Sequence, residues 1–98
     1  MLKYQLEEEL EELVLEEELE DLLEGDVSNL VVYNDNVNTF EWVIDSFMEI
    51  LGHSFTQSEQ LATLIHFKGK ATVKTAPLSE LKAPKDALVD RGLSAVIS

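Results

Sequence analysis

The chain has 98 residues, a net charge of −13 and no cysteine. This length allows one domain with a single modest core and excludes the two-domain cleft that many enzymes use. The lack of cysteine excludes a disulfide framework and thiolate chemistry, which suits a reducing, cytoplasmic location. We expect no export signal, because the residues after Met1 to Tyr4 become acidic instead of apolar, and no segment approaches the length of a membrane span.

The negative charge is concentrated at one end. Residues 1–26 hold twelve acidic residues and one lysine, a balance of −11, whereas the other 72 residues have a balance of −2. We therefore expect an acidic, partly helical N-terminal extension over residues 1–26 and a folded body over residues 27–98. An acidic arm repels phosphate backbones and anionic lipid, so we expect no nucleic acid and no membrane partner.

Leucines recur in the acidic arm at three- and four-residue steps, which is typical of a helix with apolar stripes. Runs such as Glu7 to Glu9 lack lysine partners, and the repulsion between them opposes the helix. Gly25-Asp26 predicts its end. Three roles stay open for the arm: a solvated tail, a docking segment for a partner protein, or a surface for self-association.

In the body, Leu30–Tyr33 is typical of a short strand, and the polar residues Asn34–Asn36 predict a loop after it. Asn38, with Glu41 three residues later, has the spacing of an N-cap and a capping box. This pattern predicts a helix that continues through Leu51 and is closed by a glycine.

Two further helices and two further strands follow. Thr56 and Glu59 repeat the capping pattern and predict a helix from Gln57 to about Phe67, which ends near Gly69. Residues 70–74 alternate like an exposed strand. Residues 78–91 then predict a third helix.

Pro77 suits the first turn of that third helix, whereas Pro84 is expected to bend or interrupt it. Gly92 ends it, and residues 93–97 form a last strand. The expected fold is α+β, with the order β-α-α-β-α-β: a three-stranded antiparallel sheet covered on one face by three helices and preceded by the acidic arm.

No motif indicates catalysis or a cofactor. There is no Gly-x-Ser-x-Gly elbow and no glycine-rich phosphate loop. His53 and His66 are thirteen residues apart with no cysteine, which does not form a compact metal motif. Asn34, Asn36 and Asn38 have the spacing of the first ligands of a calcium loop, but none of these three positions holds an acidic residue. We expect a binding protein that is not an enzyme, with no metal and no cofactor.

The candidate binding residues are the loop Asn34–Asn36 and His66. Three consecutive short polar residues are more simply explained as a turn. For His66, between Ile65 and Phe67, the simpler explanation is a half-buried histidine bonded to a backbone carbonyl. The two features together indicate a site more strongly than either does alone.

Three segments carry a family resemblance. Residues 33–43 (Tyr-Asn-Asp-Asn-Val-Asn-Thr-Phe-Glu-Trp-Val), residues 66–71 (His-Phe-Lys-Gly-Lys-Ala) and Arg91-Gly92-Leu93 occur in the order found in the ClpS adaptor family. The chain resembles this family over residues 29–98. The run from Asp35 to Phe40 is similar to adaptors of Bacteroidetes-like bacteria.

The resemblance implies an adaptor that binds the free N-terminal residue of N-end-rule substrates and delivers them to a Clp AAA+ unfoldase and its peptidase. An α-ammonium group has three donors and needs converging acceptors. The resemblance assigns these to Asn34, Asp35 and His66. Protonation of His66 would replace an acceptor with a like charge, so binding should weaken near pH 5.

The resemblance also implies a pocket for a large hydrophobic first side chain. Its residues transfer to Val32, Phe40, Val43, Ala62 and Ala95. Asn36 and Asn38 would meet the peptide backbone or the second residue. Phe40 and Ala62 stand where methionines are frequent in the family, Asn38 replaces threonine, and Asn36 replaces a second aspartate, so the preferred first residue stays open.

A second hypothesis also stays open. The chain could be a ClpS-like protein-interaction module whose altered pocket no longer binds free N-termini and which acts through its acidic N-terminal helix.

Overall fold

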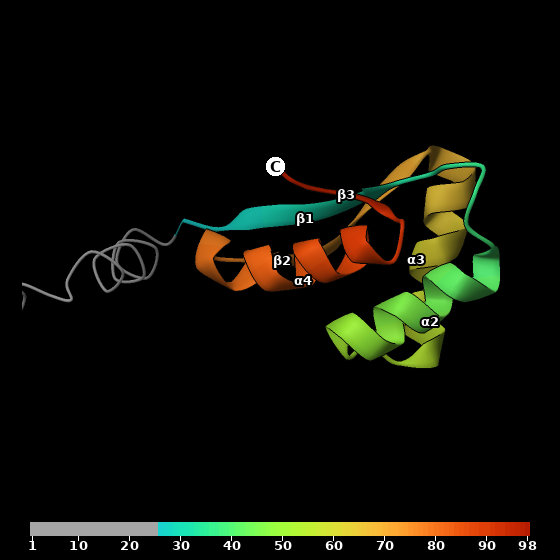
Figure 1. Cartoon of the computed structure of the whole chain (residues 1–98), viewed down its shortest axis with the longest axis horizontal. Coiled ribbons are helices and arrows are strands. Elements are labelled where there is room, and N and C mark those ends of the chain that lie inside the picture. Colours follow the sequence, from blue (N-terminus) through green and yellow to red (C-terminus); the bar gives the residue numbers. More distant parts are fainter. Residues whose placement is uncertain (1–25) are drawn as a thin grey trace, which may run out of the picture.

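The computed structural model describes residues 26–98, and the acidic arm and its predicted helix lie outside these residues. The described part has three strands and three helices (Figure 1). In chain order they are β1 (Ser28–Tyr33), α2 (Phe40–Leu51), α3 (Phe55–Lys68), β2 (Lys70–Ala76), α4 (Leu78–Asp90) and β3 (Ser94–Ile97). The predicted order β-α-α-β-α-β is confirmed.

The sheet has the strand order β2-β1-β3, and β1 pairs antiparallel with both neighbours. Leu30 and Val32 of β1 are buried on the face that meets the helices, as two-residue periodicity requires. The pairing with β2 shifts by one residue between Leu30 and Val31, which leaves Val73 as the extra residue of a β-bulge. At the start of β1, Asn29 and Ser98 exchange two backbone hydrogen bonds of 3.0 and 2.8 Å.

Helix α2 begins one residue later than the capping pattern predicts. Its N-cap is Thr39, whose hydroxyl accepts a 3.0 Å hydrogen bond from the amide of Trp42. The prediction of Asn38 as the cap is wrong, because the Asn38 side chain bonds instead to two groups outside the helix. The predicted end is confirmed: Gly52 has a φ of 72°, the left-handed conformation that glycine adopts readily.

Helix α3 begins two residues earlier than predicted. Its N-cap is Ser54, whose hydroxyl accepts from the amide of Gln57 at 3.1 Å, so the prediction of Thr56 as the cap is wrong. Thr56 lies inside the first turn. Gly69 closes the helix as predicted, and its amide donates to the carbonyl of Ile65 at 2.9 Å. The last turn of α3, which carries His66, is therefore fixed by this hydrogen bond at the end of the helix.

Pro84 was expected to bend or interrupt helix α4, and the helix runs through it without interruption. Leu81 and Leu88, on either side of the proline, are both fully buried. Burying a leucine stabilises by about 1.5 to 3 kcal/mol, so two such anchors offset one lost backbone hydrogen bond. The helix ends at Asp90, one residue before the predicted end.

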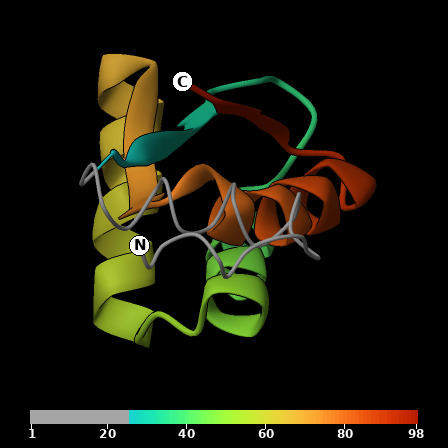
Figure 2. The same ribbon diagram turned by 90° about the vertical axis from the view of Figure 1, so that its left-hand side faces the viewer.

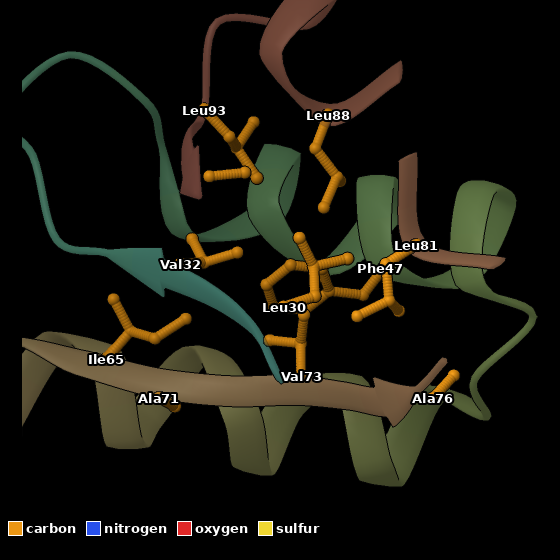
Figure 3. Packing of buried hydrophobic residues seen from close by; sticks show 11 residues of the cluster. Leu30, Val32, Phe47, Ile65, Ala71, Val73, Ala76, Leu81, Leu88 and Leu93 are labelled. Atoms are coloured by element: carbon orange, nitrogen blue, oxygen red, sulfur yellow. The ribbon is translucent and has the colours of Figure 1, made fainter. Parts of the chain in front are cut away.

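The core lies between the sheet and the helices. Its largest side chain is Phe47 of α2, which lies beside Leu30 and Leu81, while Ile65 of α3 lies further along the sheet (Figure 3). Helix α4 packs against all three strands, α3 packs against β2, and α2 packs against both other helices and lies below α4 in Figure 2. None of the described helices combines the length and apolar character needed to cross a membrane.

Candidate functional site

The polar loop after β1 is tied to the end of α3. The backbone amide of Asn34 donates to the carbonyl of Gly69 at 2.9 Å, and Tyr33 pairs with Lys70 in the sheet. Gly69 follows His66 by three residues, which is less than one helical turn. The fold therefore brings the predicted loop and the predicted histidine to the same end of the molecule. Figure 2 shows the loop arching away from β1 before it reaches α2.

The Asp35 carboxylate organises this loop from within. Its Oδ1 accepts hydrogen bonds of 2.9 Å from the amides of Val37 and Asn38, and its Oδ2 accepts a third, also of 2.9 Å, from the Asn38 side chain. Partial burial acts to raise the pKa of the Asp35 carboxyl, but the three hydrogen bonds outweigh it and lower this pKa from its ordinary value. A carboxylate offers about four acceptor sites, so a ligand would find one of them open.

Asn38 connects the loop to the far end of the chain. Its Nδ2 donates to Asp35 Oδ2 at 2.9 Å and to the backbone carbonyl of Gly92 at 2.8 Å. Both amide hydrogens are thereby used, and only the carbonyl oxygen of the side chain can accept from a ligand. This contact spans 54 positions in the sequence.

His66 is exposed in the last turn of α3, and its ring meets Phe67 edge to face with 4.9 Å between centroids. The simpler explanation, a half-buried histidine bonded to a backbone carbonyl, instead describes His53. The His53 Nε2 lies 2.8 Å from the carbonyl oxygen of Val73, the residue of the β-bulge. Because a carbonyl only accepts, this nitrogen must carry the hydrogen.

The predicted pocket residues fall into a buried group and a surface group. Val32 and Ala95 are paired across the sheet, and both are buried, as is Ala62 of α3. Val43 is partly buried against the core. Phe40, the first residue of α2, leaves 41% of its surface exposed. Asn36 lies exposed in the loop.

An open hollow of about 370 Å³ lies elsewhere, between α2, α4 and β2. It is lined by Ile50, Leu51, Lys74, Ala83, Pro84 and Ala87 and includes none of the predicted pocket residues. Within residues 26–98, no three His, Cys, Asp or Glu side chains are grouped so that they could hold a metal ion.

The sequence analysis used Arg91 and Gly92 to mark the helix end and the family resemblance, but it did not predict the contacts that their turn makes with α2. Trp42 Nε1 donates to the carbonyl of Arg91 at 3.0 Å, and the Arg91 guanidinium lies over the Trp42 ring, 5.0 Å from its centroid. The guanidinium also pairs with Glu49 and donates to Ser46 Oγ at 3.4 Å. Trp42, Ser46 and Glu49 are spaced so that they share one helix face, a local signal that does not identify Arg91 as their partner.

The comparisons with known proteins agree with this architecture. A profile of the family described as ATP-dependent Clp protease adaptor protein ClpS matches residues 25–95. The solved structure of Agrobacterium tumefaciens ClpS2 bound to L-phenylalaninamide superposes with a TM-score of 0.71, at 15% identity, over 74% of this chain and 94% of that chain. No curated protein matches the chain. Because the family profile covers most of the chain and the fold agrees with it, the chain belongs to the ClpS family of Clp protease adaptor proteins.

Proposed function

We propose that this chain is an adaptor that binds the free N-terminal residue of substrate proteins and delivers them to a Clp AAA+ unfoldase in the cytoplasm. The observation that carries the proposal is the 2.9 Å bond from the Asn34 amide to Gly69, which joins the polar loop to the helix end that bears His66. The family supplies the adaptor role. The body, residues 27–98, binds the substrate, and the acidic extension is available to bind the unfoldase.

The α-ammonium group of the substrate is bound by Asn34, Asp35 and His66. Asn34 and His66 are exposed and offer an amide oxygen and an imidazole nitrogen. Asp35 offers its one open acceptor site together with a negative charge at neutral pH, and its lowered pKa extends that charge into more acidic solution. An ammonium ion surrounded by these groups has one acceptor for each of its three hydrogens.

The first side chain of the substrate enters the body beside the α-ammonium group. Val32, Val43, Ala62 and Ala95 form its apolar floor, and the exposed Phe40 forms the rim. The small side chains of Ala62 and Ala95 favour a bulky first residue with an aromatic ring. The Agrobacterium protein was solved with phenylalaninamide, which carries a free α-amino group and an aromatic side chain. Asn36 and the oxygen of Asn38 meet the peptide beyond its first residue.

Fluorescence anisotropy tests the proposal with two labelled peptides that begin with Phe, one with a free amino group and one N-acetylated. Acetylation removes the charge and two donors, so only the free peptide should bind. His66→Ala should abolish this binding, whereas Gln60→Ala, an exposed change elsewhere on α3, should leave it unchanged. Equal binding of both peptides, or of neither, would rule out the proposal in favour of an interaction module that acts through the acidic extension.

A further inference from the structure

The turn formed by Arg91 and Gly92 is held against α2 by side chains from three successive turns of that helix. The Trp42 indole donates to the Arg91 carbonyl, and its ring lies under the guanidinium. The guanidinium donates a hydrogen bond to Ser46 and forms an ion pair with Glu49. The Arg91 side chain retains 25% of its exposure. An arginine with a stacked ring and a carboxylate partner is fixed in both position and plane.

The position of this turn fixes the loop. The carbonyl of Gly92, one residue after Arg91, accepts from Asn38 Nδ2 at 2.8 Å. The same amide group holds Asp35 Oδ2, and Asp35 Oδ1 holds the backbone of the loop. A continuous series of contacts therefore runs from Glu49 through Arg91, Gly92 and Asn38 to Asp35.

We propose that Arg91 is a positioning residue for the α-amino site. Its side chain contacts Trp42, Ser46 and Glu49 of α2, and it acts on the loop through the carbonyl of Gly92 and the side chain of Asn38. This inference rests on the proposed function. It predicts that a ligand would lose affinity when Arg91 is replaced because the loop is no longer held in one shape, since a loop that must be ordered on binding lowers the affinity.

Double-mutant cycles test this with the free-amino Phe peptide and the full chain. Arg91→Met and Asn38→Ala should each weaken binding by about tenfold, which corresponds to about 1.4 kcal/mol. Combining them should weaken it little further, because both changes break the same series of contacts. Arg91→Lys should restore only part of the affinity, because an ammonium group lacks the planar fork. Additive losses, or full rescue by lysine, would overturn the proposal.

The matched control is Lys85→Met, which removes a basic side chain from α4, the helix that precedes Arg91, where Lys85 pairs with Asp86 at 3.2 Å. This variant should bind like the unmodified chain. A loss of affinity equal to that of Arg91→Met would show that the loss of any basic charge in or next to α4 has the effect, and would also overturn the proposal.

A second measurement needs no ligand. Hydrogen exchange of the Val37 and Asn38 amides, which both donate to Asp35, should accelerate in Arg91→Met, while the Gly52 amide at the end of α2 should exchange as before. Unchanged exchange at Val37 and Asn38 would refute the positioning role. If the unmodified chain binds no free-amino peptide, the proposed function fails, and the exchange rates still decide whether Arg91 holds the loop.

Discussion

Trp42 and Arg91 contact each other in two ways at once. The indole nitrogen donates to the backbone carbonyl of Arg91 at 3.0 Å, and the guanidinium carbon lies 5.0 Å from the centre of the same ring. Forty-nine positions separate the two residues in the sequence. The pair joins the first turn of α2 to the end of α4, and so connects the helix that follows the candidate loop to the strand that closes the sheet.

Replacing Trp42 should separate these two contributions. Trp42→Phe keeps a ring under the guanidinium but loses the hydrogen bond, and should lower the free energy of unfolding by about 1 kcal/mol. Trp42→Ala also loses the ring, and should lower it by about 2 to 3 kcal/mol. Urea unfolding followed by circular dichroism measures both. Met48→Leu, an exposed change on the same helix, should stay within about 0.5 kcal/mol of the unmodified chain. Equal effects of Phe and Ala would contradict the ring contact.

The Asp35 carboxylate should stabilise the fold in a pH-dependent way. Its pKa is lower in the folded chain than its ordinary value, so the stabilisation is present above the unfolded pKa and is lost as pH falls through the folded pKa. The difference in unfolding free energy between the unmodified chain and Asp35→Asn should therefore be constant near neutrality and narrow below about pH 4. Urea titrations of both proteins across this range measure it. If the difference in unfolding free energy widened in acid, the pKa of Asp35 would be raised by folding instead of lowered, and the role of these hydrogen bonds would be refuted.

His53 and His66 should differ in what their removal changes. His53→Ala leaves the Val73 carbonyl without its 2.8 Å partner, and should lower the free energy of unfolding by about 1 to 2 kcal/mol without loss of peptide binding. His66 is exposed, so His66→Ala should alter stability by less than about 0.5 kcal/mol while abolishing peptide binding. Thermal unfolding and anisotropy on both variants test this. If both variants lose stability alike, the assignment of one structural and one binding histidine is wrong.

Binding of a free-amino peptide should weaken as the solution is acidified. A protonated imidazole at His66 cannot accept a hydrogen bond and repels the α-ammonium group, so the affinity should fall between about pH 7.5 and pH 5. Anisotropy titrations at several pH values measure this, and His53→Ala is a matched control that should show the same decline. Constant affinity over this range would remove His66 from the site.

Pro84 should destabilise the helix that contains it. A proline in a helix interior lacks the amide that would bond to the carbonyl four residues earlier, and costs about 3 kcal/mol relative to alanine. Pro84 is only partly buried at the edge of the hollow, so Pro84→Ala should remove little packing and raise the free energy of unfolding by about 1 to 3 kcal/mol. Urea unfolding measures the change. A loss of stability would show that the ring packs more favourably than its backbone cost.

The helices and strands could be predicted from the sequence because the patterns that specify them involve residues close together in the chain. The helical spacing that buries Ile44 and Phe47, and the left-handed glycines Gly52 and Gly69, depend only on nearby residues. The start of α2 was predicted wrongly because Asn38 and Thr39 are both good caps, and the choice between them is made by Gly92, far away in the sequence.

In the candidate site, too, the residues could be predicted from local sequence, whereas their contacts with distant residues could not. The residues of the loop and His66 were identified from their types and from the family resemblance, and the bond from Asn34 to Gly69 brings the two segments to one end of the fold. The hydrogen bonds that the Asp35 carboxylate accepts from its own loop were not predicted, because they depend on the folded positions of Val37 and Asn38. The role of Arg91 was hidden for the same reason.

The backbone pair between Asn29 and Ser98 separates points of attachment from the binding site. Both residues lie at one end of β1, and Asn34 follows the other end, a strand length of about 20 Å away. A fluorescent protein or surface tether joined after Ser98 would leave the body at the end opposite the loop. A substrate bound at the proposed site and a second protein bound near Ser98 would therefore lie at opposite ends of β1 and would not compete for space.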